Sequence, residues 1–135
     1  MHNYVKLLSL AATLIVLPQS PSAGPTSYVC EITGFQIPPA PDAELREWVG
    51  KEAMKTTVAI DRMTGRIIHP VIGNTSFTHV TLLNRGSRLA WNFKALADSG
   101  DGGHVRYYEV HETVPDPKKT FLAVADGIAF WGTCE

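Results

Sequence analysis

Residues 119–134 read KTFLAVADGIAFWGTC, two apolar runs separated by Asp126 and Gly127. An Asp-Gly pair between apolar runs favours a two-residue hairpin loop with a type I′ turn. Counting outward from this loop predicts which residues of the two strands oppose each other. The predicted pairs are Ala125 with Ile128, Val124 with Ala129, Ala123 with Phe130, Leu122 with Trp131, and Phe121 with Gly132.

Both faces of this hairpin are apolar. Alternate residues of a strand share a face, so Phe121 lies on the same side as Phe130 and Cys134, and we expect this side to belong to the core. The opposite side carries Leu122, Val124 and Trp131. A hairpin that is apolar on both sides needs cover on both.

One helix is predicted, over residues 43–49 and on toward residue 53. Asp42 can cap its start, and Leu45, Trp48 and Val49 share one side of it at helical spacing. We expect this helix to cover the second side of the hairpin. The alternative is that another molecule covers it, which would make a binding face of Leu122, Val124 and Trp131.

The rest of the chain predicts strands. Runs of β-branched and aromatic residues alternate with turn residues about every eight to twelve positions, which is typical of an antiparallel domain. The predicted strands are residues 27–33, 54–61, 66–71, 75–84, 87–96, 104–113, 119–125 and 128–134. The fold class is therefore all-β with one short helix, an antiparallel meander of about eight strands that forms a small barrel or sandwich.

A second hairpin is expected around Arg85 and Gly86, where a one-residue slip would exchange the two faces of its strands. The preferred register keeps His79 outward and pairs Leu82 with Leu89 and Val80 with Trp91. The alternative register pairs Phe77 with Phe93 and His79 with Trp91. We prefer the first because it matches two apolar pairs without burying an imidazole.

The two cysteines of the chain, Cys30 and Cys134, lie in the first and last predicted strands. We expect them to form a disulfide that joins these strands, since the spacings of a redox pair or a zinc site are not present. Closing a loop of about 100 residues contributes about 4.7 kcal/mol in the chain-entropy model.

Residues 1–23 have the pattern of a secretory signal peptide. Lys6 precedes the apolar run 7–17, and small residues follow at Ser20, Ser22 and Ala23. The run is shorter than the roughly 20 residues needed to span a bilayer. We expect cleavage after Ser22 or Ala23, with no stable membrane insertion afterwards. Residues 24–135 are then a single β-rich domain, exported to the periplasm or the cell exterior.

The overall charge excludes two classes of partner. The 135 residues carry 12 Lys plus Arg against 13 Asp plus Glu, a formal net charge of −1. Nucleic acids and anionic membranes are bound mainly through basic surfaces. We therefore expect neither a nucleic acid nor an anionic membrane as a partner. The length of the chain fits one domain.

One group of polar residues has side chains that could take part in catalysis. Tyr107, Glu109 and His111 alternate along one predicted strand and share a face. His111 with Glu109 could act as a base and its orienting carboxylate. The alternative is a solvated strand face. Because the histidines lack the usual metal-ligand spacings, neither a metal nor a cofactor is expected.

These features lead to three functional hypotheses. The preferred one is a small exported binding protein without chemistry of its own, which binds either another exported protein or a surface ligand. Small periplasmic inhibitors of secreted hydrolases share this size, an analogy of architecture only. The first alternative is a carrier of a small apolar ligand inside a β-barrel. The second is a hydrolase or metal enzyme that uses His111 and Glu109.

Overall fold

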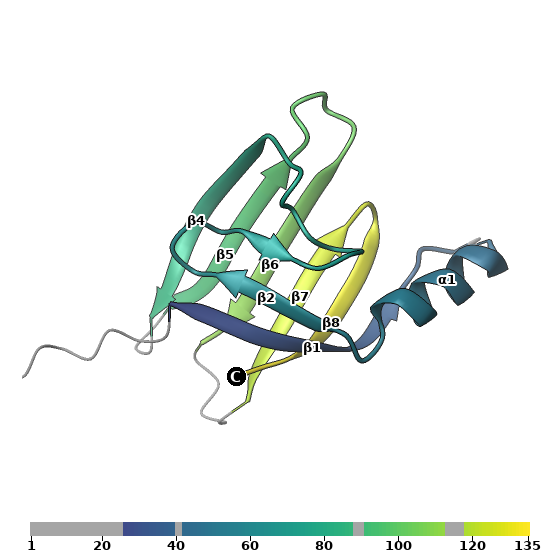
Figure 1. Cartoon of the computed structure of the whole chain (residues 1–135), viewed down its shortest axis with the longest axis horizontal. Coiled ribbons are helices and arrows are strands. Elements are labelled where there is room, and N and C mark those ends of the chain that lie inside the picture. Colours follow the sequence, from purple (N-terminus) through teal and green to yellow (C-terminus); the bar gives the residue numbers. More distant parts are fainter. Residues whose placement is uncertain (1–25, 40–41, 88–90, 113–117) are drawn as a thin grey trace, which may run out of the picture.

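A single curled sheet of eight antiparallel strands forms the body of the chain, in the order β3-β2-β1-β8-β7-β6-β5-β4 (Figure 1). The computed structural model describes residues 26–39, 42–87, 91–112 and 118–135. The strands are β1 Ser27–Gln36, β2 Thr57–Asp61, β3 Ile67–Ile68, β4 His79–Ser87, β5 Trp91–Asp98, β6 Val105–His111, β7 Lys119–Ala125 and β8 Ile128–Cys134. The sheet curls into a half-barrel, which confirms the predicted antiparallel architecture.

The first and last strands pair directly, and they join the two parts of the sheet. β1 contacts β2 along one edge and β8 along the other. Cys30 and Cys134 are register partners in β1 and β8, both are buried, and they form the predicted disulfide. The seam between β1 and β8 therefore has backbone pairing and a covalent bond at the same place.

The β7–β8 hairpin has the register that its turn residues predict, from Ala125 opposite Ile128 to Phe121 opposite Gly132. Asp126 and Gly127 have φ values of 53° and 82°. A type I′ turn requires a positive φ at both central residues, so the turn chemistry accounts for the register.

Aromatic side chains fill the concave side of the half-barrel. The largest fully buried ones come from five strands and are Tyr28, Phe93, Tyr108, Phe121 and Phe130. Tyr28 and Phe93 meet edge to face at 5.7 Å between ring centroids, an arrangement that aromatic pairs favour. The hydroxyl of Tyr108 donates to the carbonyl of Ile72 at 2.6 Å. The inner side of the sheet is therefore a packed core.

The predicted helix is present as α1, Ala43–Ala53, and Asp42 Oδ1 accepts the Glu44 N–H at 2.9 Å as its cap. Its expected position over the second side of the hairpin is wrong. β1 continues to Gln36, opposite Ala129 beside the hairpin turn, so the chain reaches the end of the half-barrel before the helix begins. In Figure 1, α1 projects from that end.

The expected registers of the β4–β5 hairpin are both wrong. Val80 pairs with Ala97 and Ser87 with Trp91, so the two strands are connected through residues 88–90, which lie outside the described residues. Gly86 is a strand residue with φ +76°. A Cβ there would lie 3.1 Å from Tyr28 Oη and 3.1 Å from Glu112 Cγ. Glycine suits this position because its φ is positive and the packing is close, and not because it lies in the hairpin turn. His79 nevertheless lies on the exposed outer side, as expected.

β2 and β3 are also shorter than predicted. β2 starts at Thr57 because Met54 caps α1 and Lys55 has a positive φ of 58°. β3 ends at Ile68 because His69 folds the chain into a tight turn, in which its carbonyl accepts the Gly73 N–H at 3.0 Å.

The predicted signal peptide, residues 1–23, lies outside the described residues. Within the part of the chain that the structure describes, no helix has the length and apolar character needed to cross a membrane.

Replacing Cys30 or Cys134 by Ser should lower the free energy of unfolding by about 2 to 5 kcal/mol, because the unfolded chain regains the freedom that the disulfide removes. Denaturant unfolding of the single variants and the wild type measures this loss. Mass analysis of the protein purified without reductant should find no free thiol, and two free thiols would contradict the assignment.

Candidate functional site

The two sets of candidate residues predicted from the sequence share one outer face of the sheet. Tyr107 on β6 is the register partner of Val124 on β7, and Glu109 is the partner of Leu122. Leu122 is in turn the partner of Trp131 on β8. The polar set and the apolar set are therefore immediate neighbours on the convex side of the half-barrel.

Leu122, Val124 and Trp131 form what we call the outer apolar patch. Val124 is 37% exposed and Trp131 is 43% exposed, while Leu122 is half-buried. Trp131 lies over Gly34 of β1, where a Cβ would overlap the indole. The missing side chain of Gly34 lets the indole lie against the sheet, so Trp131 is held in place and still faces solvent.

The patch extends to one residue that was not predicted. Leu96 of β5 is the register partner of Tyr107, and it lies in the same row as Val124. Predicting this neighbour requires the β5–β6 register, which depends on the long connection between these strands and has no turn signature as specific as Asp-Gly.

A network of polar side chains centred on Glu109 borders the patch. Asn92 Nδ2 donates to Glu109 Oε1 at 2.8 Å, and the Tyr107 hydroxyl donates to Oε2 at 2.8 Å. Lys94 Nζ lies 3.7 Å and His111 Nε2 3.5 Å from Oε1. Both carboxylate oxygens therefore have a hydrogen-bond donor, and two basic side chains lie close to one of them.

These contacts determine the protonation of the network. Partial burial alone would raise the pKa of Glu109, but hydrogen bonds from Asn92 and Tyr107 and the nearby Lys94 and His111 lower it below its ordinary value. Burial and the bond to Glu109 raise the pKa of Tyr107 to about 12. Glu109 is therefore an anion that accepts the hydrogen bonds of Tyr107 and Asn92.

A second charged cluster, which was not predicted, lies inside the half-barrel. The Glu112 side chain is 1% exposed, with Lys119 Nζ 2.8 Å from Oε2 and Arg62 Nη2 3.4 Å from Oε1. The Tyr28 hydroxyl donates to Glu112 as well. Arg62 also donates to the carbonyls of Arg85 and Gly86 at 3.1 and 2.9 Å. The cluster ties the turn after β2 to β4 and β6.

The position of Glu112 follows the inward alternation of Tyr108 and Val110, a signal in the sequence that could have identified it. Burial would raise the pKa of Glu112, but hydrogen bonds from Lys119 and Tyr28 and the charges of Lys119 and Arg62 lower it. A buried carboxylate with these partners holds the fold together at the end away from α1.

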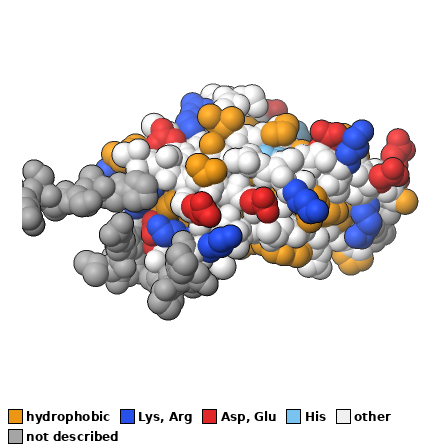
Figure 2. All heavy atoms as spheres, turned by 60° about the horizontal axis from the view of Figure 1, so that its bottom comes forward, with side chains coloured by type: hydrophobic (Ala, Val, Ile, Leu, Met, Phe, Trp, Pro, Cys, Tyr) orange, Lys and Arg blue, Asp and Glu red, His pale blue; other side chains and the backbone are white. Residues whose placement is uncertain are grey.

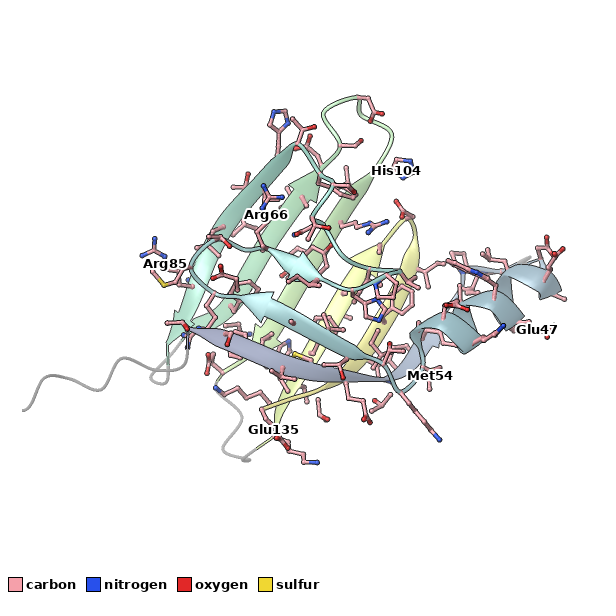
Figure 3. All side chains as sticks on the ribbon, viewed as in Figure 1. Glu47, Met54, Arg66, Arg85, His104 and Glu135 are labelled. Atoms are coloured by element: carbon pink, nitrogen blue, oxygen red, sulfur yellow. A yellow bond between two sulfur atoms is a disulfide. The ribbon has the colours of Figure 1, made fainter. Side chains whose placement is uncertain are left out.

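A groove of about 400 Å³ lies at the end of the half-barrel near α1. Its apolar wall is formed by Leu45, Trp48, Pro70, Val71, Ile128 and Phe130. Its rim holds an ion pair in which Arg106 Nη2 lies 2.8 Å from Asp126 Oδ2, and His104 Nδ1 lies 2.8 Å from Asp126 Oδ1. Figure 3 labels His104 near this rim and Met54 where α1 ends beside the sheet.

The surface has no large area of one charge on the side shown in Figure 2, where acidic and basic side chains alternate with hydrophobic ones. Among the described residues, no group of three or more His, Cys, Asp or Glu side chains is placed to hold a metal ion. We interpret the outer apolar patch and the groove beside α1 as candidate functional surfaces.

Replacing Tyr107 by Phe should raise the pKa of Glu109, because the carboxylate loses a hydrogen bond that favours its charged form. NMR titration of the Glu109 carboxyl carbon measures the change. Tyr108→Phe is the control, since the Tyr108 hydroxyl binds Ile72 inside the core.

Folding lowers the pKa of Glu109. The contribution of Glu109 to folding stability is therefore present above the unfolded pKa near 4.5 and is lost as the pH falls through the folded pKa. An unchanged pKa in Tyr107→Phe would contradict the network.

No model of a protein family, no curated protein and no solved structure matches this chain.

Proposed function

We propose that this protein is a small exported binding protein, and that the outer apolar patch is the surface on which it binds another exported protein. The exposure of Trp131 on a hairpin that is apolar on both sides is the observation that carries the proposal. The inner side of this hairpin belongs to the core, and α1 does not cover the outer side.

The shape of the patch favours a protein partner over a small molecule. The patch lies on the convex side of a curled sheet, and such a surface cannot enclose a small ligand. A tryptophan held in one place and surrounded by smaller apolar groups is typical of the residues that dominate binding energy at protein interfaces. We expect the partner to present a flat or concave apolar surface to it.

The polar network beside the patch supports the same proposal. Glu109, with Asn92 and Tyr107, forms a hydrogen-bonded border to the apolar area, as the polar rim of an interface does. In this proposal His111 and Glu109 contribute to the rim of a binding site. This role takes the place of the catalytic one considered from the sequence.

The location of the protein rests on two features of the chain. A structural disulfide is common in oxidising compartments and rare in the cytosol. The predicted signal peptide agrees with it, and both support export.

A second candidate function is binding of a small apolar ligand in the groove beside α1. The supporting observation is its volume of about 400 Å³, which is within the range of small-molecule sites, together with a Trp48 side chain that is 51% exposed. Because aromatic side chains fill the interior of the half-barrel, the ligand would lie at its end. An apolar fluorescent probe that binds the wild type and not Trp48→Ala would support this candidate.

Replacing Trp131 by Ala should weaken binding of the partner by about 2 kcal/mol or more, as at the centre of an interface. Its effect on the free energy of unfolding should be about 1 kcal/mol, well below the loss for a buried tryptophan, since the indole is partly exposed. The measurements are denaturant unfolding and co-purification from the exported fraction with the partner quantified.

Trp48→Ala is the matched control, because Trp48 is also exposed but belongs to α1. Loss of binding in Trp48→Ala with full binding in Trp131→Ala would move the site to the groove. A loss of folding stability of several kcal/mol in Trp131→Ala would show that the indole is part of the core.

A further inference from the structure

His69 is a buried histidine with both of its ring nitrogens in hydrogen bonds. It is 8% exposed. Its Nδ1 accepts the backbone N–H groups of Val71 at 3.0 Å and Ile72 at 3.2 Å. Its Nε2 lies 2.6 Å from the hydroxyl oxygen of Thr56, and this hydroxyl donates to the carbonyl of Ala53 at the end of α1.

This arrangement fixes the tautomer of the ring. A nitrogen that accepts two N–H groups carries no proton, so the single proton of the neutral imidazole is on Nε2 and is donated to Thr56. Protonation of the ring would place an N–H on Nδ1 in front of the N–H groups of Val71 and Ile72. Both of these hydrogen bonds would then be lost.

The charged groups around this segment are mostly basic. From the residue before β3, Arg66 donates to the carbonyls of Asn74 and Thr75 at 3.3 and 3.4 Å. From β6, Arg106 donates to the carbonyl of Gly73. Lys55, beside Thr56, is exposed. Asp126 is the carboxylate in this group of contacts, and it forms an ion pair with Arg106.

A charge on His69 therefore has no compensating partner among the described residues. Burial lowers its pKa, and no neighbouring carboxylate offsets this effect. Protonation would add a positive charge to a segment that two guanidinium groups already contact.

The segment that His69 holds closes the end of the half-barrel. Pro70 and Val71 form part of the groove wall with Leu45 and Trp48. Ile72 is buried, and its carbonyl accepts the hydroxyl of Tyr108. The bond to Thr56 links the segment to the end of α1. One ring therefore connects the 69–74 segment, the helix and the groove between them.

We propose that His69 is a pH-sensitive latch. The neutral ring keeps the 69–74 segment closed against the end of α1, and the protonated ring releases the segment, which forms one wall of the groove. The latch follows from the hydrogen bonds of His69 and does not depend on the function proposed above.

Amide hydrogen exchange read by NMR tests the latch in the full exported domain. After correction for intrinsic rates, the protection of the Val71 and Ile72 amides should fall about tenfold or more between about pH 7.5 and about pH 4, while that of Ile60 in β2 changes less. Protection of Val71 and Ile72 that is equal at both pH values would overturn the proposal.

His69→Asn is the informative variant, because an asparagine oxygen accepts N–H groups two and three residues ahead and does not titrate. Its Val71 and Ile72 amides should stay protected at low pH. His79→Asn, at an exposed histidine on the outer side of β4, should behave as the wild type. If the Val71 and Ile72 amides of His69→Asn lose as much protection at low pH as those of the wild type, the latch proposal is overturned.

The ring itself provides a test that needs no variant. Nitrogen chemical shifts of His69 in the wild type should show the Nε2–H tautomer at neutral pH and a pKa below the ordinary 6.5. Folded stability from this residue is then present above pH 6.5 and is lost as the pH falls through the lowered value. An Nδ1–H tautomer, or a pKa at or above 6.5, would contradict the proposal.

Discussion

Pairing of β1 with β8 is the interaction on which the rest of the molecule depends. Without it the sheet would separate into β2–β3 with β1 on one side and β4 to β8 on the other. The Cys30–Cys134 disulfide fixes the register at one end of this seam. At the other end Gln36 pairs beside the hairpin turn, which places α1 at the end of the half-barrel and leaves the outer side of β7 and β8 uncovered.

The same seam explains why an apolar side chain can be both held and exposed. Gly34 of β1 is the register partner of Trp131, and its lack of a side chain provides the place for the indole. The concave side is already filled by aromatic rings and is closed at one end by the Glu112 cluster. The convex patch is therefore separate from the core, and a partner could use it without unfolding any part of the sheet. The proposed His69 latch lies at a third location, the end of the half-barrel that carries the groove.

The sequence predicted correctly the features that depend on residues close together in the chain or on a unique pairing. Asp126 and Gly127 specify the β7–β8 register through their own backbone preferences, and a chain with two cysteines has one possible pairing. The predicted β4–β5 register was wrong because Gly86 packs closely against Tyr28 and Glu112, which are distant in the sequence. The predicted position of α1 was wrong because it depends on where β1 ends. The candidate residues were identified one strand at a time, and only the β6–β7 register shows that Glu109 and Leu122 are neighbours.

Oxidative footprinting of Trp131 and Trp48, which are both exposed, tests most directly the claim that the outer apolar patch is the binding surface. Hydroxyl-radical oxidation is measured by mass spectrometry on the purified monomer and on the protein in its own exported fraction. We expect Trp131 to be oxidised in the monomer and protected in the exported fraction, with Trp48 oxidised equally in both. Equal oxidation of Trp131 in both samples, or protection of Trp48 alone, would contradict the account.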